Sequence, residues 1–214
     1  ASDVYKRQMW PVPLCESWAA LFMNKTEILH YLRTASRVDD PRLLALIDDC
    51  MAEVDATVQP RTLERIFPCR VTEDALEVEG FTLKSRRLAQ TIAGCDRVCI
   101  FGATLGFECD RLLRTYSVDG IARGAVMQAV LASKIEEVCD GIENRLRAQG
   151  LTLRQRYSPG YFDLDITEQR KIFALLDLTK RIGLTLSDTC QMIPTKSVTA
   201  IIGIEPQDGG QAHE

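Results

Sequence analysis

The chain contains very little histidine, a residue on which several large classes of enzyme depend. It contains two histidines among 214 residues, His30 and His213. A histidine-based metal site, a Ser-His-Asp triad or a Cys-His pair therefore has almost no material. No stretch approaches the roughly 20 apolar residues that a membrane-spanning helix needs, and the N-terminus does not resemble a signal peptide. We expect a cytoplasmic protein that does not enter a membrane.

A large excess of charge of one sign is also absent. The 26 basic residues stand against 30 acidic residues, which gives a net charge of −4. A surface for nucleic acid or for an anionic membrane needs a strong local excess of Lys and Arg to neutralise phosphates. We therefore expect neither nucleic acid nor a membrane among the partners.

The eight cysteines include no Cys-x-x-Cys pair. Several of them lie in apolar periodic segments, where a small thiol packs well in a protein interior. The spacing of Cys95 and Cys99 allows a metal pair, but the sequence has no second close pair to complete four ligands. We interpret the cysteines as reduced, structural thiols, and we expect Cys190 to be buried rather than redox-active.

The composition that is present, 46% apolar, 7% aromatic and 26% charged, is that of an ordinary soluble domain. Helical periodicity with capping residues predicts helices at 24–33, 41–59, 86–93, 107–116, 119–149 and 166–182. Patterns typical of strands predict two or three antiparallel strands within 62–83, a buried strand in "RVCIFGATLG", a strand in "LTLRQRY" and two strands joined around "IPTK", the second of them central. These elements predict a single α+β domain with a twisted, mainly antiparallel sheet flanked by helices.

The stretch "RYSPGYFD" is the strongest candidate for a binding loop. Pro159 fixes φ, and Gly160 permits a close approach of the backbone that a Cβ atom would block. Tyr157 or Tyr161 could pack on a planar ligand, and the fork of Arg156 suits a carboxylate. The alternative is a strand-to-helix turn with an incidental surface arginine, and the residues alone leave both interpretations open.

Two other patterns are weaker. "GATLG" lies between a predicted strand and a predicted helix, where a phosphate-binding loop would be placed, but it lacks the spacing of a nucleotide-binding motif. A tight turn that glycine permits is the better interpretation. Glu136 and Glu137 lie beside Lys134 on the long helix and could serve a cation, although such charges usually lie on a solvated face.

The quoted loop, followed by "QRKIFALLDLTKRIGLTLSDTCQMIPTKSVTAIIGI", resembles the activation domain of cobalamin-dependent methionine synthase. The hallmarks of this family are an Arg-x-x-Pro-Gly-Tyr loop, a helix ending in a Leu-Leu pair and a final Lys-Ser-Val-Ser-Ala-like strand. The earlier "GCDRVCIFGATLGFECDRLLRTYS" is similar to the short stand-alone members. The resemblance covers residues 25–204. We assign 1–8 to a non-native leader, 9–24 to an N-terminal extension and 205–214 to a flexible tail.

The resemblance implies that the chain binds S-adenosylmethionine through Arg156, Tyr157, Ser158, Pro159, Gly160, Tyr161 and Glu137. In this assignment Arg156 pairs with the ligand's carboxylate, and the backbone of 157–160 cradles the nucleoside. Tyr161 forms a wall of the pocket, and Glu137 faces the ammonium or sulfonium charge. The implied activity is reductive remethylation of cob(II)alamin on a partner, with one electron from a reductase such as flavodoxin. The methyl transfer takes place at the partner's cobalt, so whether the chain itself is an enzyme stays open.

The sequence departs from the family in three places. The helical Asp-Ala-x-Gly-Ser pattern is replaced by the stretch from Gln128 to Ser133. After Ile204 we expect no counterpart of the tyrosine-bearing segment of the large synthases. An Asp-x-His-x-x-Gly loop for cobalamin is absent, so the cobalamin is expected on a partner, a methionine synthase core or a related corrinoid protein. Two alternatives stay open: a non-catalytic cap or chaperone for a corrinoid protein, and a methyltransferase with another acceptor. The lack of an evident general base makes the latter weaker.

Overall fold

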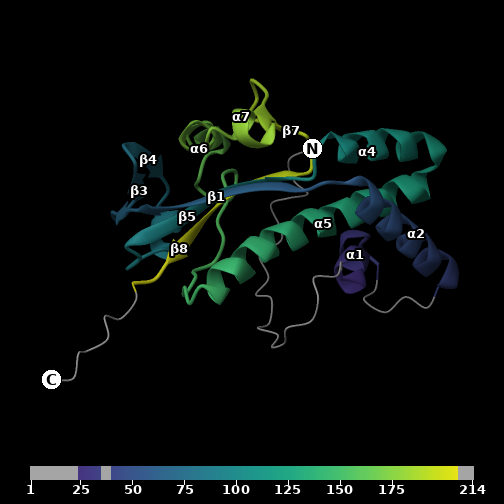
Figure 1. The fold of residues 1–214 in the computed structure, drawn as a ribbon, viewed down its shortest axis with the longest axis horizontal. Helices are drawn as coiled ribbons and strands as arrows, with labels where there is room; N and C mark the ends of the chain where they lie inside the picture. Colours follow the sequence, from purple (N-terminus) through teal and green to yellow (C-terminus); the bar gives the residue numbers. More distant parts are fainter. Residues whose placement is uncertain (1–23, 35–39, 207–214) are drawn as a thin grey trace.

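The centre of the fold is a three-stranded antiparallel sheet, seen in a computed structural model that describes residues 24–34 and 40–206. Its strands are β1 (Arg61–Pro68), β5 (Arg97–Thr104) and β8 (Ser197–Ile204), in the order β1-β5-β8. β5 pairs with both neighbours along its whole length. Its residues after Arg97 are all buried, because helices lie against both faces of the sheet (Figure 1).

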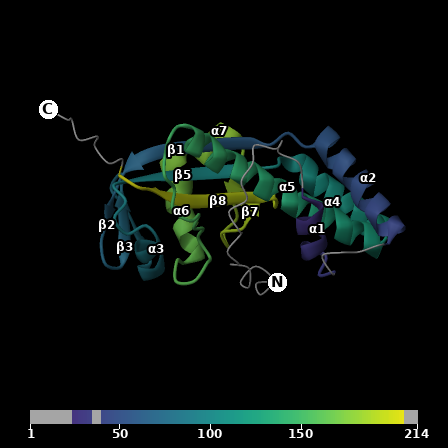
Figure 2. The ribbon, with the colours of Figure 1, turned by 90° about the horizontal axis from the view of Figure 1, so that it is seen from below.

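One face of the sheet is covered by the long helix α5 (Ile121–Ala148). Three further helices pack against α5: α1 (Lys25–Tyr31), α2 (Pro41–Thr57) and α4 (Phe107–Asp119). Figure 2 shows these three helices gathered beyond one end of the sheet. The sequence specifies the start of α2, since Asp40 caps it with a bond of 2.9 Å from the Arg42 N–H and Pro41 occupies its first position.

The opposite face is covered by a short helical run: η1 (Ile166–Glu168), α6 (Gln169–Leu176) and α7 (Leu178–Ile182). The chain changes direction between α6 and α7 at Asp177, whose φ of 52° lies in the left-handed region. Ile172, Leu176 and Leu178 pack in one apolar cluster with residues of β5 and β8. The sheet is therefore enclosed between α5 on one side and the α6–α7 pair on the other.

Two small sheets complete the fold. They consist of β2 (Arg70–Val71), β3 (Ala75–Val78) and β4 (Phe81–Lys84), and of β6 (Thr185–Leu186) with β7 (Met192–Ile193). Helix α3 (Arg86–Thr91) follows β4 and contacts β3. Ser85 caps α3, because its hydroxyl oxygen accepts a hydrogen bond of 2.9 Å from the Leu88 N–H.

The predicted α+β class, antiparallel pairing and flanking helices are confirmed. Four details were wrong. The two or three strands expected within 62–83 are four, β1 to β4, and they belong to two sheets, with β1 paired to β5. The expected helix at 166–182 is interrupted at Asp177. The segment "LTLRQRY" makes only two isolated bridges to β8. β8 is beside the central strand and is not itself central; its apolar run reflects helices on both faces.

Some predictions lie outside the described residues. The leader at 1–8, the N-terminal extension and nearly all of the tail at 205–214 belong to this group, as do Cys15 and His213. Within the described part of the chain, no helix combines the length and the apolar character that a bilayer crossing requires.

The contact between β5 and α7 leaves no room for a side chain at Gly102. A methyl group there would lie 2.7 Å from Leu178 Cδ2 and 2.9 Å from Cδ1. We expect Gly102→Ala to lower the free energy of unfolding by about 1–3 kcal/mol through overpacking. Leu178→Ala alone should cost about 2–5 kcal/mol through a cavity. In chemical denaturation, the double variant should lose clearly less than the two single losses combined, and strict additivity would contradict this packing.

Candidate functional site

The loop "RYSPGYFD" is anchored along the outer edge of β8. The Tyr157 N–H donates to Ile201 O at 2.9 Å, and the Ile201 N–H donates to Tyr157 O at 2.8 Å. The Tyr157 ring is buried, with 3% exposure. The pair of bonds places the start of the loop directly against the sheet, so the position of Arg156 is fixed by backbone geometry.

The turn itself is closed by its own backbone. The Gly160 N–H donates to Leu164 O at 2.8 Å, and the Tyr161 N–H donates to Ser158 O at 3.3 Å. Gly160 has a φ of +90°, which a residue with a Cβ atom rarely adopts, and a Cβ atom there would lie 3.0 Å from Ile166 Cδ1. Pro159 is buried, whereas Gly160 is exposed. Pro159 and Gly160 therefore both contribute to the conformation of this turn, as their positions in the sequence predicted.

Asp163 ties the end of the loop to the first turn of α3. Its carboxylate accepts a short hydrogen bond from the Ser85 hydroxyl and one of 3.1 Å from the Arg87 N–H. Burial opposes ionisation of Asp163, but these hydrogen bonds together outweigh it and hold the pKa of the carboxyl below its usual value. The Tyr157 hydroxyl lies 3.5 Å from the same carboxylate. Asp163 thus connects the loop with α3.

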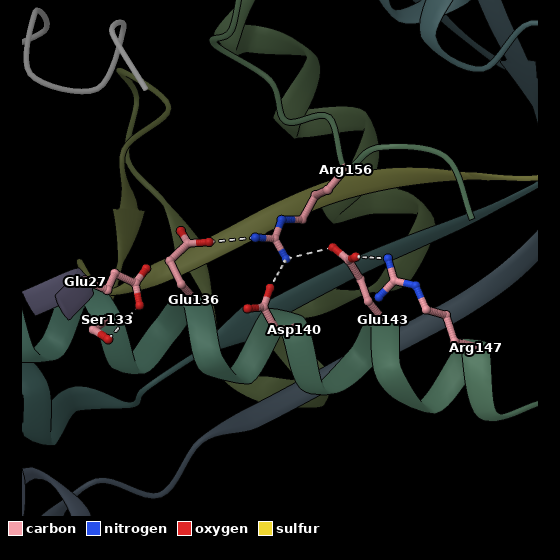
Figure 3. Close-up of polar contacts among 7 residues, drawn as sticks. All are labelled: Glu27, Ser133, Glu136, Asp140, Glu143, Arg147 and Arg156. Carbon is pink, nitrogen blue, oxygen red and sulfur yellow. Dashed lines mark hydrogen bonds and ion pairs between the residues drawn. The ribbon is translucent and has the colours of Figure 1, made fainter. Parts of the chain in front are cut away.

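Arg156 extends from the loop over the middle of α5 and contacts three carboxylates (Figure 3). Its Nη2 donates to Glu136 at 2.6 Å, while Nη1 donates to Glu143 at 3.0 Å and to Asp140 at 3.3 Å. The Arg156 side chain is 21% exposed. These carboxylates occupy positions i, i+4 and i+7 of α5, which lie on one face of a helix.

The site carries more negative than positive charge. Glu27 of α1 joins the row and accepts a hydrogen bond of 2.9 Å from Ser133, and Arg147 donates to Glu143 at 2.8 Å. Burial raises the pKa of Glu136 and of Asp140; Arg156 opposes the shift, and neighbouring carboxylates add to it. Burial also raises the pKa of Glu27. The arrangement places one guanidinium, whose donors suit a carboxylate, beside a row of acidic groups that suit a cation.

Glu137 is not among the partners of Arg156. It accepts hydrogen bonds of 3.1 and 3.2 Å from Lys134, which also forms an ion pair of 2.9 Å with Asp55 of α2. Glu136 and Glu137 were predicted as a possible cation site, whereas Asp140 and Glu143 were not predicted. The spacing of Glu136, Asp140 and Glu143 indicates that they share one face of the helix, but it does not indicate that Arg156 lies over that face.

The turn "GATLG" does not have the environment of a phosphate site. The Gly106 N–H donates to the Thr104 hydroxyl at 3.1 Å, and Glu108 and Asp110 lie in the first turn of α4. The Asp110 carboxylate accepts a hydrogen bond of 3.2 Å from the Thr195 N–H. The negative charge that a helix N-terminus favours is therefore already provided by the chain's own side chains.

The described cysteines are all free thiols. Cys190 is 3% exposed, as predicted, and its sulfur accepts a hydrogen bond of 3.2 Å from Arg170. Burial raises the pKa of Cys69 to about 11 and that of Cys99 to about 12. Among residues 24–34 and 40–206, no group of His, Cys, Asp and Glu side chains is placed to hold a metal ion.

The chain matches a protein family by sequence and a solved structure by fold. The family described as "Vitamin B12 dependent methionine synthase, activation domain" matches residues 87–209, more than half of the chain. A crystal structure of the MetH reactivation domain bound to AdoHcy is similar, with a TM-score of 0.61 and 19% identity. The match covers 78% of this chain and 65% of that one, so this chain spans just under two thirds of the solved domain. No curated protein matches the sequence.

The carboxylate of Asp163 should stabilise the junction between the loop and α3. We expect Asp163→Ala to lower the free energy of unfolding by about 1 kcal/mol at pH 7, because the Arg87 N–H and the Ser85 hydroxyl lose an acceptor. Since the folded pKa is lowered, this contribution is present above the ordinary Asp value of about 3.9 and disappears as the pH falls through the lowered pKa.

Urea denaturation from pH 7 to pH 2.5 checks this expectation. Asp49→Ala is the control, because Asp49 is an exposed residue of α2 far along the sequence from the loop. A difference between the wild type and Asp163→Ala that stays constant across the whole pH range would contradict the role of the ionised carboxylate.

Proposed function

Because the chain belongs to the family of the vitamin B12-dependent methionine synthase activation domain, we propose that it binds S-adenosylmethionine and supports the reductive remethylation of cob(II)alamin on a partner. The observation that carries the proposal is the position of Arg156. The "RYSPGYFD" loop places the guanidinium of Arg156 beside a row of carboxylates. The amino acid part of S-adenosylmethionine is a zwitterion, so its site needs a positive and a negative group close together. When bound, the ligand would supply an electrophilic methyl group on its sulfonium.

The ligand would be oriented by its amino acid end. Arg156 would take the carboxylate, and an acidic residue of α5 would take the ammonium or sulfonium charge. The family resemblance assigned the acidic role to Glu137. The contacts favour Glu136, which lies 2.6 Å from Arg156, whereas Glu137 is already paired with Lys134. Glu137 and Glu136 are therefore the two candidates for this role.

The nucleoside would lie against the backbone of 157–160. Gly160 is exposed and lacks the Cβ atom that would keep a ligand away from this turn. Tyr161 would form the wall of the pocket, next to the half-buried Ser158. The fixed position of Tyr157 on β8 and the closed turn support a preformed site, so little ordering of the loop would accompany binding.

The corrinoid would be held by a partner, a methionine synthase core or a related corrinoid protein. A reductase such as flavodoxin would supply the electron, and all three proteins would meet in the cytoplasm. The chain would contribute the bound methyl donor and cover the corrinoid during transfer. Since the reacting cobalt belongs to the partner, the chain would be an accessory component of a methyltransferase.

A second function is favoured by one observation. All three carboxylates around Arg156 lie within ion-pair distance, so acidic residues of the chain itself satisfy the guanidinium. A non-catalytic cap or chaperone for a corrinoid protein would need the fold and the docking surface but no free arginine. Docking without S-adenosylmethionine binding would identify this alternative.

The assignment of Arg156 predicts a strong effect on ligand binding. In isothermal titration calorimetry with S-adenosylmethionine, Arg156→Ala should lose about 2–4 kcal/mol of binding free energy, because a charge-assisted bidentate contact disappears. Arg154→Ala is the matched control. Arg154 forms an ion pair of 3.1 Å with Glu205 and is 47% exposed, so its loss should be nearly silent.

Equal losses for the two arginine variants would contradict the assignment. The same titration with Glu136→Gln and Glu137→Gln identifies the acidic partner. The variant of the residue that contacts the ligand's cationic end should bind more weakly than the other, and we expect this to be Glu136→Gln.

A reconstitution tests the proposed activity itself. The purified chain is mixed with a cognate cobalamin-bearing synthase core, a reductant and S-adenosylmethionine, and the visible spectrum of the corrinoid is followed. We expect methylcobalamin to form only when the chain is present, and Arg156→Ala should abolish its formation. Failure to form methylcobalamin with a chain that binds S-adenosylmethionine would overturn the remethylation function.

A further inference from the structure

Asp140 accepts a hydrogen bond of 3.3 Å from Nη1 of Arg156, on the edge of the guanidinium that faces the acidic row. Resting on the proposed function, we propose that the Asp140 carboxylate competes with the ligand's carboxylate for Arg156 and thereby limits the affinity of the site. Ligand binding is then an exchange of ion pairs, in which Asp140 is released to solvent.

The competition follows from the donors of the guanidinium. A carboxylate binds an arginine best through two parallel N–H groups on one edge of the planar fork. In the structure, the two terminal nitrogens are divided among three carboxylates: Nη2 contacts Glu136, and Nη1 contacts both Asp140 and Glu143. Nη1 carries two N–H groups and both face a carboxylate, so a further carboxylate can bind across Nη1 and Nη2 only after Asp140 or Glu143 is released.

Asp140 is the contact that opens most easily. Its distance to Nη1, 3.3 Å, is the longest of the three, and its side chain is 62% exposed. Glu143 is 14% exposed and is also held by Arg147 at 2.8 Å. Glu136 lies 2.6 Å from Nη2. Water can hydrate a released Asp140, whereas a released Glu143 would remain largely enclosed.

An attractive role for Asp140 makes the opposite prediction. If its charge served mainly to attract the cationic groups of the ligand, neutralising it would weaken binding. We favour competition because Asp140 shares Nη1 of Arg156 with Glu143, whereas Glu136 contacts Nη2 alone and is the acidic residue that the contacts favour for the cationic end. The exposed side chain of Asp140 is also screened by solvent and salt.

Titration of S-adenosylmethionine into the wild type and Asp140→Asn distinguishes these roles. We expect Asp140→Asn to bind about two- to fivefold more tightly, the range that corresponds to one exposed ion pair. Asp49→Asn is the matched control. It makes the same chemical change and removes one negative charge, but at an exposed position of α2, so it should leave the affinity unchanged.

Decarboxylated S-adenosylmethionine provides a second readout, because it keeps the cationic groups and lacks the competing carboxylate. Asp140→Asn should not tighten the binding of this analogue. If the wild type binds S-adenosylmethionine and Asp140→Asn leaves the affinity unchanged or weakens it, the competition is overturned. Equal tightening of both ligands by Asp140→Asn would also overturn it. Both results would leave the proposed function intact. If neither the wild type nor Asp140→Asn bound S-adenosylmethionine, the competition and the proposed function would both fail. Thermal melting of each variant verifies that it is folded.

Discussion

The antiparallel pairing of β5 with β8 is the constraint on which the other parts of the structure depend. It places two strands side by side between helical layers, so both strands are apolar on both faces. The outer edge of β8 is then available to the segment that follows α5, and Tyr157 bonds to Ile201 there. Because α5 lies against the same sheet, the arginine before Tyr157 meets the acidic face of that helix.

The contacts of Arg156 combine an unfavourable desolvation of carboxylates with a favourable attraction between opposite charges. Removing a carboxylate from water is unfavourable, and the raised pKa of Glu136 is consistent with this cost. The guanidinium offsets part of it, since it is shared among three carboxylates at hydrogen-bond distance. A site with an excess of negative charge is better suited to a cation, or to a zwitterion with an additional positive charge, than to a simple anion.

The family assignment and the local geometry support each other on different grounds. The match over 87–209 includes the loop, α6, α7 and β8, but it does not cover α1 or α2. The solved reactivation domain supports the fold, and at 19% identity it supports the fold alone. The roles of individual side chains therefore depend on the distances within this chain. By these distances Arg156 binds three carboxylates of the chain itself, and Glu137 is mainly a partner of Lys134.

The sequence by itself determined the local elements. Asp40 and Pro41 begin α2, Gly150 follows the end of α5, and the apolar run of β5 required burial. It also identified the stiff turn at Pro159 and Gly160, because these residues restrict or extend the backbone locally. The tertiary structure alone decided which carboxylates meet Arg156 and that β1 pairs with β5. Such contacts join residues far apart in the chain, and their geometry depends on how α5 packs on the sheet, which no local pattern encodes.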